Sequence, residues 1–183
     1  ENLKTLCAAG AASGSIALLH IVGITPEART VDEAFGPKTP TAIYTITEQD
    51  LLDTRKDMNT HQGKNVDLIA LGCPQYTINE IVKVKELLAG RKIAPNIQFW
   101  IYANSFAIDM AEKMGVRREL EKAGVTIRAE TCMIISPIHE WEFKTIMTDS
   151  GKCVHYGPME CSAEMVFGST EECVEAGVAG HAL

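Results

Sequence analysis

The sequence predicts an α/β fold in which a mostly parallel sheet is flanked by helices. Apolar runs of strand length recur along the 183 residues, helical patterns with capping residues stand between them, and the links are short. This alternation is typical of strand–helix–strand units, whose strands pair in parallel. We treat 1–183 as one region, with a possible sub-domain break near 60–65, where the sequence is most polar.

The first third of the chain is expected to alternate in the same way. Thr25-Pro26-Glu27 has the form of a cap and a proline at a helix start, and Thr47 precedes acidic residues in a first helical turn. "TAIYTIT" alternates as a half-buried strand does, and "SIALLHIVG" reads as a buried strand. We expect helices over 2–13, 25–36 and 47–59, and strands over 15–23 and 41–47.

The remaining two thirds show the pattern more clearly. "NVDLIALG" is a short apolar run that ends in glycine, as central parallel strands often do. Gly115 and Gly124 are expected to end their helices, and Ser169 or Thr170 to cap the last one. We expect strands over 65–72, 96–103, 125–131, 143–149 and 163–169, and helices over 77–89, 105–115, 116–124 and 169–180.

Composition excludes several classes of function. The net charge of −7 argues against a nucleic-acid partner or an anionic membrane surface. No apolar run reaches about 18 residues, so no membrane span is expected. The six cysteines form no Cys-x-x-Cys pair, and we expect reduced thiols in a cytoplasmic protein rather than a disulfide framework. The chain does not begin with methionine, so we expect part of a longer gene product or a trimmed chain.

Reactive residues gather after the expected strands. In parallel sheets, ligands bind outside the carboxyl ends of the strands, so residues at these positions are the first candidates for a site. They are His20 late in the strand 15–23, Cys73, Asn104 with Ser105, Cys132, and the stretch 149–152. For His20, a satisfied core histidine is the simpler interpretation.

Two of the candidates are cysteines. Cys73 lies in a Gly-Cys-Pro turn, where it is either a small buried residue or a reactive thiol, and Cys132 has a similar setting. Two cysteines that follow two parallel strands can reach the same iron ion. Two thiolates are too few to hold an iron–sulfur cluster. A third ligand must then come from Cys153, another cysteine such as Cys7 or Cys161, or a part of the protein outside this sequence.

A second candidate site is the Ser-Gly-Lys stretch. Ser150, Gly151 and Lys152 combine a hydroxyl, a glycine amide and an ammonium group at an expected helix start, which suits an anion. The alternative is a capped helix with a surface lysine. The glycine spacing of a phosphate-binding loop and the Gly-x-Ser-x-Gly of a hydrolase are both absent, so neither class is supported.

Several motifs occur in an order that resembles a known family. "ENLKTL", "AAGAASGSIALLHIVGITPEA", "VDLIALGCP", "ETCMIISP", "FKTIMTDSGKCVHYGP" and "VFGSTEECVEA" span nearly the whole chain. Together they resemble the catalytic, or large, part of aconitase X proteins. The resemblance implies an aconitase-superfamily-like fold, an iron–sulfur cluster or mononuclear iron, and a small swivelling domain, either fused or as a separate subunit. It also implies dehydration of cis-3-hydroxy-L-proline or mevalonate 5-phosphate.

The resemblance assigns roles to individual residues. Cys73 and Cys132 match the family's cluster ligands, Ser150 matches its catalytic serine, and Lys152 lies in its substrate region with Gly151. We add Asn104, Ser105 and His20 as candidate substrate-binding residues.

Two departures from the family pattern narrow this assignment. The family's third cysteine lies in an upstream Cys-Thr-Pro-Tyr segment that this sequence lacks, so the chain is similar to the C-terminal part of a longer catalytic region. Asn104 and Ser105 stand where many members have Ser-Arg, which weighs against a phosphorylated substrate.

The expected function is therefore dehydration of a small hydroxy acid, with cis-3-hydroxy-L-proline favoured over mevalonate 5-phosphate. Iron would act as a Lewis acid on the hydroxyl, Ser150 as the base and Lys152 as the carboxylate partner. The expected partners are the rest of the catalytic region and the small swivel-domain subunit. Two alternatives stay open: a non-catalytic α/β subunit that acts through a partner chain, and a metal-free enzyme that uses Ser150.

Overall fold

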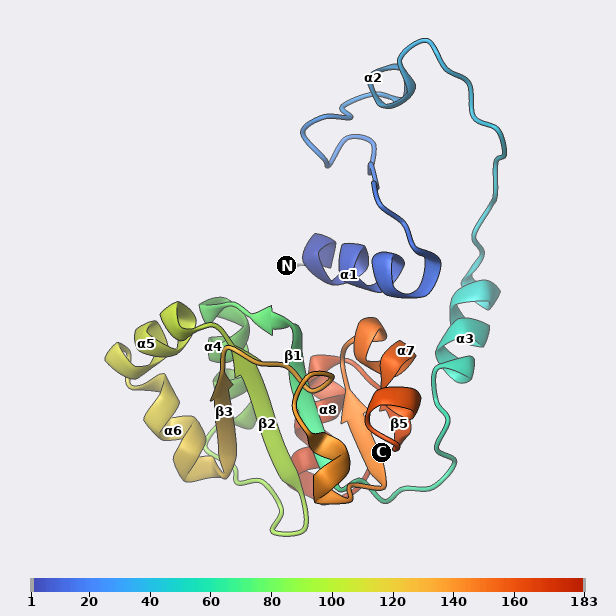
Figure 1. Cartoon of the computed structure of the whole chain (residues 1–183). Helices are drawn as coiled ribbons and strands as arrows, with labels where there is room; N and C mark the ends of the chain where they lie inside the picture. The colour runs from blue at the N-terminus through green and yellow to red at the C-terminus, as the bar shows by residue number, and fades with distance from the viewer. Residues whose placement is uncertain (1, 183) are drawn as a thin grey trace.

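Five parallel strands form the single sheet at the centre of the molecule (Figure 1). The structure is a computed structural model that describes residues 2–182. The strands are β1 Leu68–Tyr76, β2 Gln98–Ala103, β3 Val125–Ala129, β4 Thr145–Thr148 and β5 Glu164–Phe167. The helices are α1 Asn2–Gly14, α2 Val31–Phe35, α3 Glu48–Asp57, α4 Ile78–Leu88, α5 Ser105–Lys113, α6 Val116–Ala123, α7 Gly151–Glu160 and α8 Thr170–Ala179, with a 3-10 turn at Ile138–Trp141. The expected α/β fold is thereby confirmed.

Both faces of the sheet are buried, because side chains alternate along each strand. Ile69 and Leu71 of β1 pack on one face against α4, α5, α6 and α8. Leu68 and Ala70 of the same strand pack on the other face, where α7 and the segment 131–143 cover them. This two-sided burial explains why the strands read as nearly continuous apolar runs.

The order of the strands, β3-β2-β1-β4-β5, reverses direction in the middle of the sheet. The chain builds outward from β1 to β2 and β3, and then returns to place β4 and β5 on the other side of β1. The carboxyl ends of β1 and β4 therefore open a crevice where the two halves part. In sheets of this kind, ligands bind at such a switch point.

Local capping explains where the helices begin. Thr47 accepts a hydrogen bond from the Asp50 amide, and Asp50 accepts one from the Thr47 amide, so the start of α3 is a capping box. The same arrangement begins α8 at Ser169. Gly124 adopts a left-handed φ of 98° after α6, as the sequence predicts.

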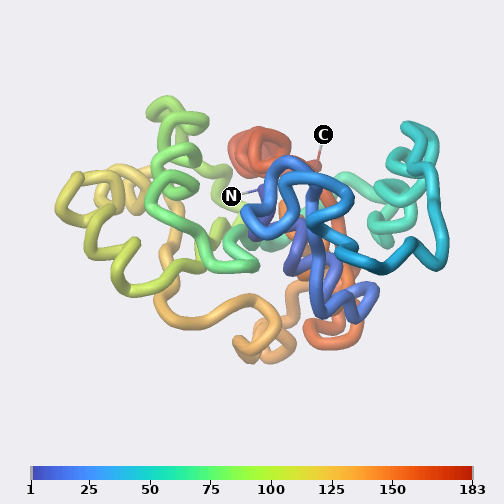
Figure 2. Tube along the Cα trace, turned by 90° about the horizontal axis from the view of Figure 1, so that it is seen from above, coloured from blue at the N-terminus to red at the C-terminus, as the bar shows by residue number. Residues whose placement is uncertain are grey.

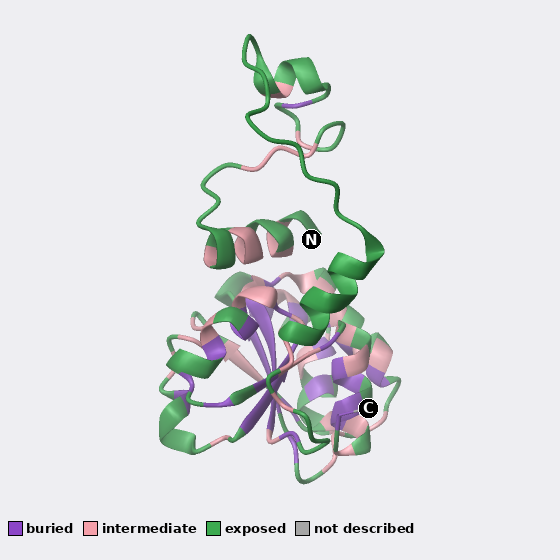
Figure 3. Cartoon of the chain, turned by 90° about the vertical axis from the view of Figure 1, so that its right-hand side faces the viewer, coloured by how far each residue is buried: buried purple, intermediate pink, exposed green. Residues whose placement is uncertain are grey.

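Two of the expected strands are wrong, and both fall in the segment 15–46, here called the arm, or at its end. Neither 15–23 nor 41–47 forms a strand, and Thr25-Pro26-Glu27 lies in a turn ahead of α2, which begins at Val31 after Thr30. The arm rises above α1, away from the sheet (Figures 1 and 3). An alternating apolar pattern gives a strand only where a neighbouring strand supplies hydrogen bonds, and the described residues supply none here.

The view from above places the arm over the middle of the molecule, with α3 at one side (Figure 2).

The length of α7 and the 3-10 turn were not part of the sequence-based expectation. None of the helices in residues 2–182 is both long and apolar enough to cross a membrane.

Candidate functional site

A pocket of about 700 Å³ lies at the switch point of the sheet. Its walls come from α1, α3, α4 and the carboxyl ends of β1, β4 and β5, with the starts of α7 and α8. The lining residues are Asn2, Thr5, Leu6, Ala9, Leu51, Arg55, Met58, Cys73, Pro74, Tyr76, Glu80, Lys83, Asp149, Gly151, Phe167, Gly168, Ser169, Thr170 and Glu171.

Cys73 reaches this pocket because β1 is irregular at its end. Gly72 has a φ of +95°, and a Cβ on it would lie 2.1 Å from the Tyr102 carbonyl oxygen, so only glycine fits. The Cys73–Pro74 peptide bond is cis, and regular pairing with β2 resumes only at Tyr76. The Gly-Cys-Pro stretch thus leaves the ladder and presents the cysteine at the crevice.

Three thiols meet behind the pocket. The Cys73 thiol interacts with those of Cys132, from the segment after β3, and Cys153, from the first turn of α7. The interaction with Cys132 lowers the pKa of Cys73, but the interaction with Cys153 and burial outweigh it and raise the pKa to about 12. The interaction with Cys73, followed by burial, raises the pKa of Cys132.

Thiols are suitable donors for iron. In residues 2–182, however, no group of three or more His, Cys, Asp or Glu side chains has an arrangement that would hold a metal ion. The thiols of Cys73 and Cys132 thus have the donor chemistry of an iron site without its full set of donors.

Ser150 joins the two elements that carry this site. Its Oγ accepts a hydrogen bond from the Cys153 amide at 3.1 Å, which caps α7, and donates one to the Cys73 carbonyl oxygen. Ser150 is buried, whereas the adjacent Gly151 lines the pocket beneath Ala9 of α1. The positive charge of Lys152 acts to lower the pKa of the Cys73 thiol, but the raising contributions are larger.

Of the eight candidate residues, only Cys73 and Gly151 line the pocket, and Cys132, Ser150 and Lys152 are not in its lining. Asn104, Ser105 and His20 do not line it either. Asn104 caps α5 by accepting a hydrogen bond from the Ala107 amide at 2.8 Å, and the Ser105 amide donates to Glu130 at 2.6 Å. Both are exposed at the end of β2. His20 lies in the arm, not in a strand, and its Nδ1 atom is buried without a hydrogen-bond partner among the described residues.

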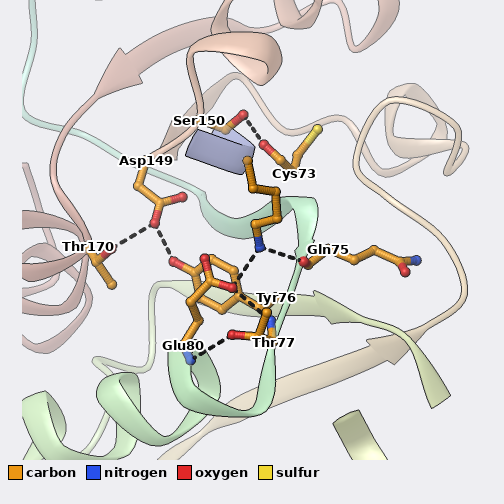
Figure 4. A network of polar contacts seen from close by, with 9 residues as sticks. Cys73, Gln75, Tyr76, Thr77, Glu80, Asp149, Ser150 and Thr170 are labelled. Atoms are coloured by element: carbon orange, nitrogen blue, oxygen red, sulfur yellow. Dashed lines mark hydrogen bonds and ion pairs between the residues drawn. The ribbon is translucent and has the colours of Figure 1, made fainter. Parts of the chain in front are cut away.

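Sequence reasoning missed a hydrogen-bonded group on the pocket wall. The Tyr76 hydroxyl donates to the Asp149 carboxylate, and the Thr170 hydroxyl donates to the same oxygen at 2.8 Å (Figure 4). Burial raises the pKa of Asp149, although both hydrogen bonds lower it, and burial beside Asp149 also raises the pKa of Tyr76. Asp149 was among the sequence-based candidates, as part of the stretch 149–152 after β4, but it was given no role, and its partners Tyr76 and Thr170 were missed.

The basic residues at the pocket are all paired. Lys4 of α1 binds Glu80 at 2.7 Å and the Gln75 carbonyl oxygen at 2.9 Å, which ties α1 to the end of β1. At the rim, Lys83 pairs with Glu171 at 2.8 Å and Arg55 with Glu172 at 2.6 Å.

Comparison with known proteins decides the family. Residues 66–179 match the model of the aconitase X third domain, and residues 1–56 match that of the second domain. The chain belongs to the aconitase X family. The matched third domain holds the whole sheet, and the matched second domain holds α1, most of α3 and the arm.

Aconitase X relatives include two kinds of dehydratase. The chain is 37% identical, over 96% of its length, to the phosphomevalonate dehydratase large subunit of Methanocaldococcus jannaschii. It is 32% identical, over 99% of its length, to the cis-3-hydroxy-L-proline dehydratase of Hypocrea jecorina. These matches cover 42% and 31% of the two relatives, so the chain spans less than half of their length.

The fold is also that of a solved aconitase X. The crystal structure of Thermococcus kodakaraensis aconitase X in its holo form superposes with a TM-score of 0.79 at 28% identity. The match covers 94% of this chain and 43% of that one.

Proposed function

We propose that this chain carries one wall of the active site of a hydro-lyase that dehydrates a small hydroxy acid. One observation supports the proposal most. At the switch point of the sheet, a pocket of about 700 Å³ is lined by Cys73, whose thiol interacts with two others and whose carbonyl oxygen accepts a hydrogen bond from Ser150. The family membership supports it, because the relatives named above are dehydratases.

Cys73 and Cys132 are the residues that would hold iron or an iron–sulfur cluster. Their thiols interact, Cys73 lies near the end of β1 and Cys132 in the segment after β3, and sulfur is the donor that such groups prefer. When bound, iron would supply Lewis-acid polarisation of the substrate hydroxyl. Further donors come from Cys153 or from a segment outside this chain.

Ser150 and Lys152 would handle the substrate. Ser150 is the N-cap residue of α7. The backbone amides of the first helical turn point toward this position, and their dipoles favour negative charge on the serine oxygen. That environment supports Ser150 as the base that removes the carbon-bound proton. Lys152 would hold the substrate carboxylate, and Gly151 lets it approach without a side chain in the way.

The charge balance of the pocket favours an unphosphorylated substrate. Among the described lining residues, both cations, Arg55 and Lys83, are engaged by glutamates. A phosphate would have to break these ion pairs, so we favour a substrate similar to cis-3-hydroxy-L-proline over mevalonate 5-phosphate.

The site is completed by other chain segments in this proposal. The relatives that match are longer, and some are named large subunits, which implies a small-subunit partner. We propose that the remaining catalytic region and a small subunit close the pocket, and that the assembly works in the cytoplasm, where the free thiols stay reduced.

Metal binding by the chain tests the thiol site directly. Under anaerobic conditions, Co²⁺ added to the purified chain should give a sulfur-to-metal charge-transfer band that is lost in C73S and C132S. C7S is the matched control, because Cys7 is exposed on α1 and away from the cluster. A band that survives in C73S would contradict the assignment of the metal ligands.

Substitution of two capping residues separates catalysis from folding. Ser150 and Thr47 each cap a helix, and Thr47 does not line the pocket, so S150A and T47A should lose similar helix-capping energy, about 1 kcal/mol. In the assembled enzyme, only S150A should lose dehydratase turnover, by 10²-fold or more. Turnover that survives a chelator but not S150A would instead indicate a metal-free serine enzyme.

A further inference from the structure

The carboxyl group of Asp149 is anchored on one side and open on the other. Its Oδ2 atom accepts hydrogen bonds from the hydroxyl groups of Tyr76 and Thr170. Its other oxygen, Oδ1, has no side-chain donor among residues 2–182 (Figure 4). Asp149 also lines the pocket. A carboxyl group held in this way can exchange a proton with a bound ligand without losing its position.

Among residues 2–182, no cation forms an ion pair with this carboxyl group. Lys4 binds Glu80, and the rim cations Arg55 and Lys83 bind glutamates of α8. The charged and titratable groups around Asp149 are Lys4 on α1, Arg55 on α3, Cys73 and Tyr76 on β1, Glu80 and Lys83 on α4, Lys152 on α7, and Glu171, Glu172 and Cys173 on α8. Burial therefore dominates and raises the pKa of Asp149. The neutral acid persists to a higher pH than in an exposed aspartate.

We propose that Asp149 is the acid that protonates the departing hydroxyl group of the substrate, with Tyr76 and Thr170 as positioning residues. The inference rests on the dehydration proposed above and adds a group that the expected iron and serine chemistry leaves out. It assigns a use to a carboxyl group at the pocket that forms no ion pair with a cation among residues 2–182.

The step balances within the chain. The substrate C–O bond breaks with its electron pair on oxygen, and the proton of Asp149 joins that oxygen to give water. Ser150 first loses its hydroxyl proton to solvent, and its alkoxide then takes the proton from the neighbouring carbon and becomes a hydroxyl again. The electrons of that C–H bond form the double bond. Asp149 is left as a carboxylate whose charge the two hydroxyl donors stabilise, and it regains from solvent the proton that Ser150 released there.

The test compares two reactions of one substrate in the assembled enzyme. With cis-3-hydroxy-L-proline or mevalonate 5-phosphate in D₂O, proton NMR follows both dehydration and exchange of the carbon-bound proton. D149N keeps an oxygen acceptor for Tyr76 and Thr170 but cannot donate the acidic proton. We expect D149N to slow dehydration by 10²- to 10⁴-fold while exchange stays within a few fold of wild type.

A second variant tests the coupling to Tyr76. Y76F removes a hydroxyl donor that stabilises the Asp149 carboxylate, so the pKa of Asp149 should rise further. An acid works only while protonated, so the fall of the dehydration rate at high pH should move to higher pH in Y76F. A purely structural role for the pair would not move this profile.

The outcomes separate the two proposals. The acid role is overturned if D149N dehydrates within a few fold of wild type, if dehydration and exchange fall together in D149N, or if the Y76F profile does not move. If wild type neither dehydrates nor exchanges either substrate, the proposed function itself is overturned, and the acid role falls with it. Thermal unfolding of each variant confirms that it is folded before the rates are compared.

Discussion

At the scale of single residues, the backbone at Gly72 decides where Cys73 lies. A Cβ at this position would meet the backbone of β2, and the positive φ disfavours any L side chain. We therefore expect G72A to lower the free energy of unfolding by about 3 kcal/mol or more, or to change the pairing at the end of β1.

Gly90 provides the matched control for this substitution. Its φ of +78° is also left-handed, but a Cβ there would meet nothing within 4 Å. G90A should therefore cost only the conformational strain, about 1 kcal/mol. Urea unfolding of both variants measures the difference, and equal midpoints would contradict the proposed clash with Tyr102.

Asp149 gives the chain a pH dependence that can be measured without substrate. Because burial raises the pKa of this carboxyl in the folded state, the native chain holds its proton more tightly than the unfolded chain does. Its contribution to stability is thus full below the ordinary aspartate value of 3.8 and is lost as the pH rises through the folded pKa.

D149N removes this penalty, so at pH 8 we expect the variant to be more stable than wild type. Below pH 4 the two should be nearly equal, because both carry a neutral side chain there. Thermal unfolding across the pH range measures the effect, and D67N is the control. Asp67 accepts hydrogen bonds from the Lys144 and Thr145 amides, so its substitution should destabilise instead.

Sequence reasoning found some of the site residues and missed others for a physical reason. Cys73 and Ser150 follow apolar strands directly, so the rule for parallel sheets placed them at one edge before the structure was known. Tyr76 was missed because its position depends on the irregular turn before it. Asn104 was expected on the same grounds as Cys73, but β2 lies one strand away from the switch point and its carboxyl end does not line the pocket.

At the scale of whole elements, capping residues predicted helices better than alternation predicted strands. Thr47 and Ser169 cap helices at the expected positions, because a cap is a local hydrogen bond that needs no distant partner. The expected strand 41–47 failed because a strand needs a neighbour. The strands of the sheet were found where two-sided burial gave apolar runs.

The position of α1 depends on a side chain that a sequence pattern does not identify. Lys4 spans from α1 to Glu80 and to the Gln75 carbonyl oxygen, and both partners are at least partly buried. We expect K4M to weaken the docking of α1 by about 1 to 2 kcal/mol, because it leaves the Glu80 carboxylate without its cation.

Hydrogen exchange measures this docking. Amides of α1 should exchange roughly 5- to 30-fold faster in K4M, a range that corresponds to 1 to 2 kcal/mol. K113M is the matched control, since Lys113 is an exposed helical lysine with no ion-pair partner among the described residues. Unchanged exchange in α1 would show that apolar packing against α7 alone holds it.

At the scale of the whole molecule, the sheet and the arm have opposite character. The sheet buries both faces, whereas the arm exposes large apolar side chains, with Leu18 75%, Ile43 85% and Tyr44 87% exposed. Exposed apolar groups of this size on a soluble protein usually mark a contact surface. The arm belongs to the segment that matches the aconitase X second domain, and the relatives continue beyond the matched region.

We therefore expect the arm to become ordered when the chain assembles with the rest of the catalytic region. In the chain alone, amides of 15–46 should exchange with solvent within seconds, and proteases should cut there first, because few backbone hydrogen bonds protect them. Once the remaining catalytic region is added, the same amides should become protected from exchange. The effect should be largest in 41–47, because its alternating apolar pattern suits a strand that pairs with a neighbouring strand. The β2 amides of 98–103 are the internal reference, since the sheet already protects them in the chain alone. If the arm stays unprotected in an assembly that dehydrates its substrate, the exposed apolar residues serve some other contact, and the pocket is completed without them.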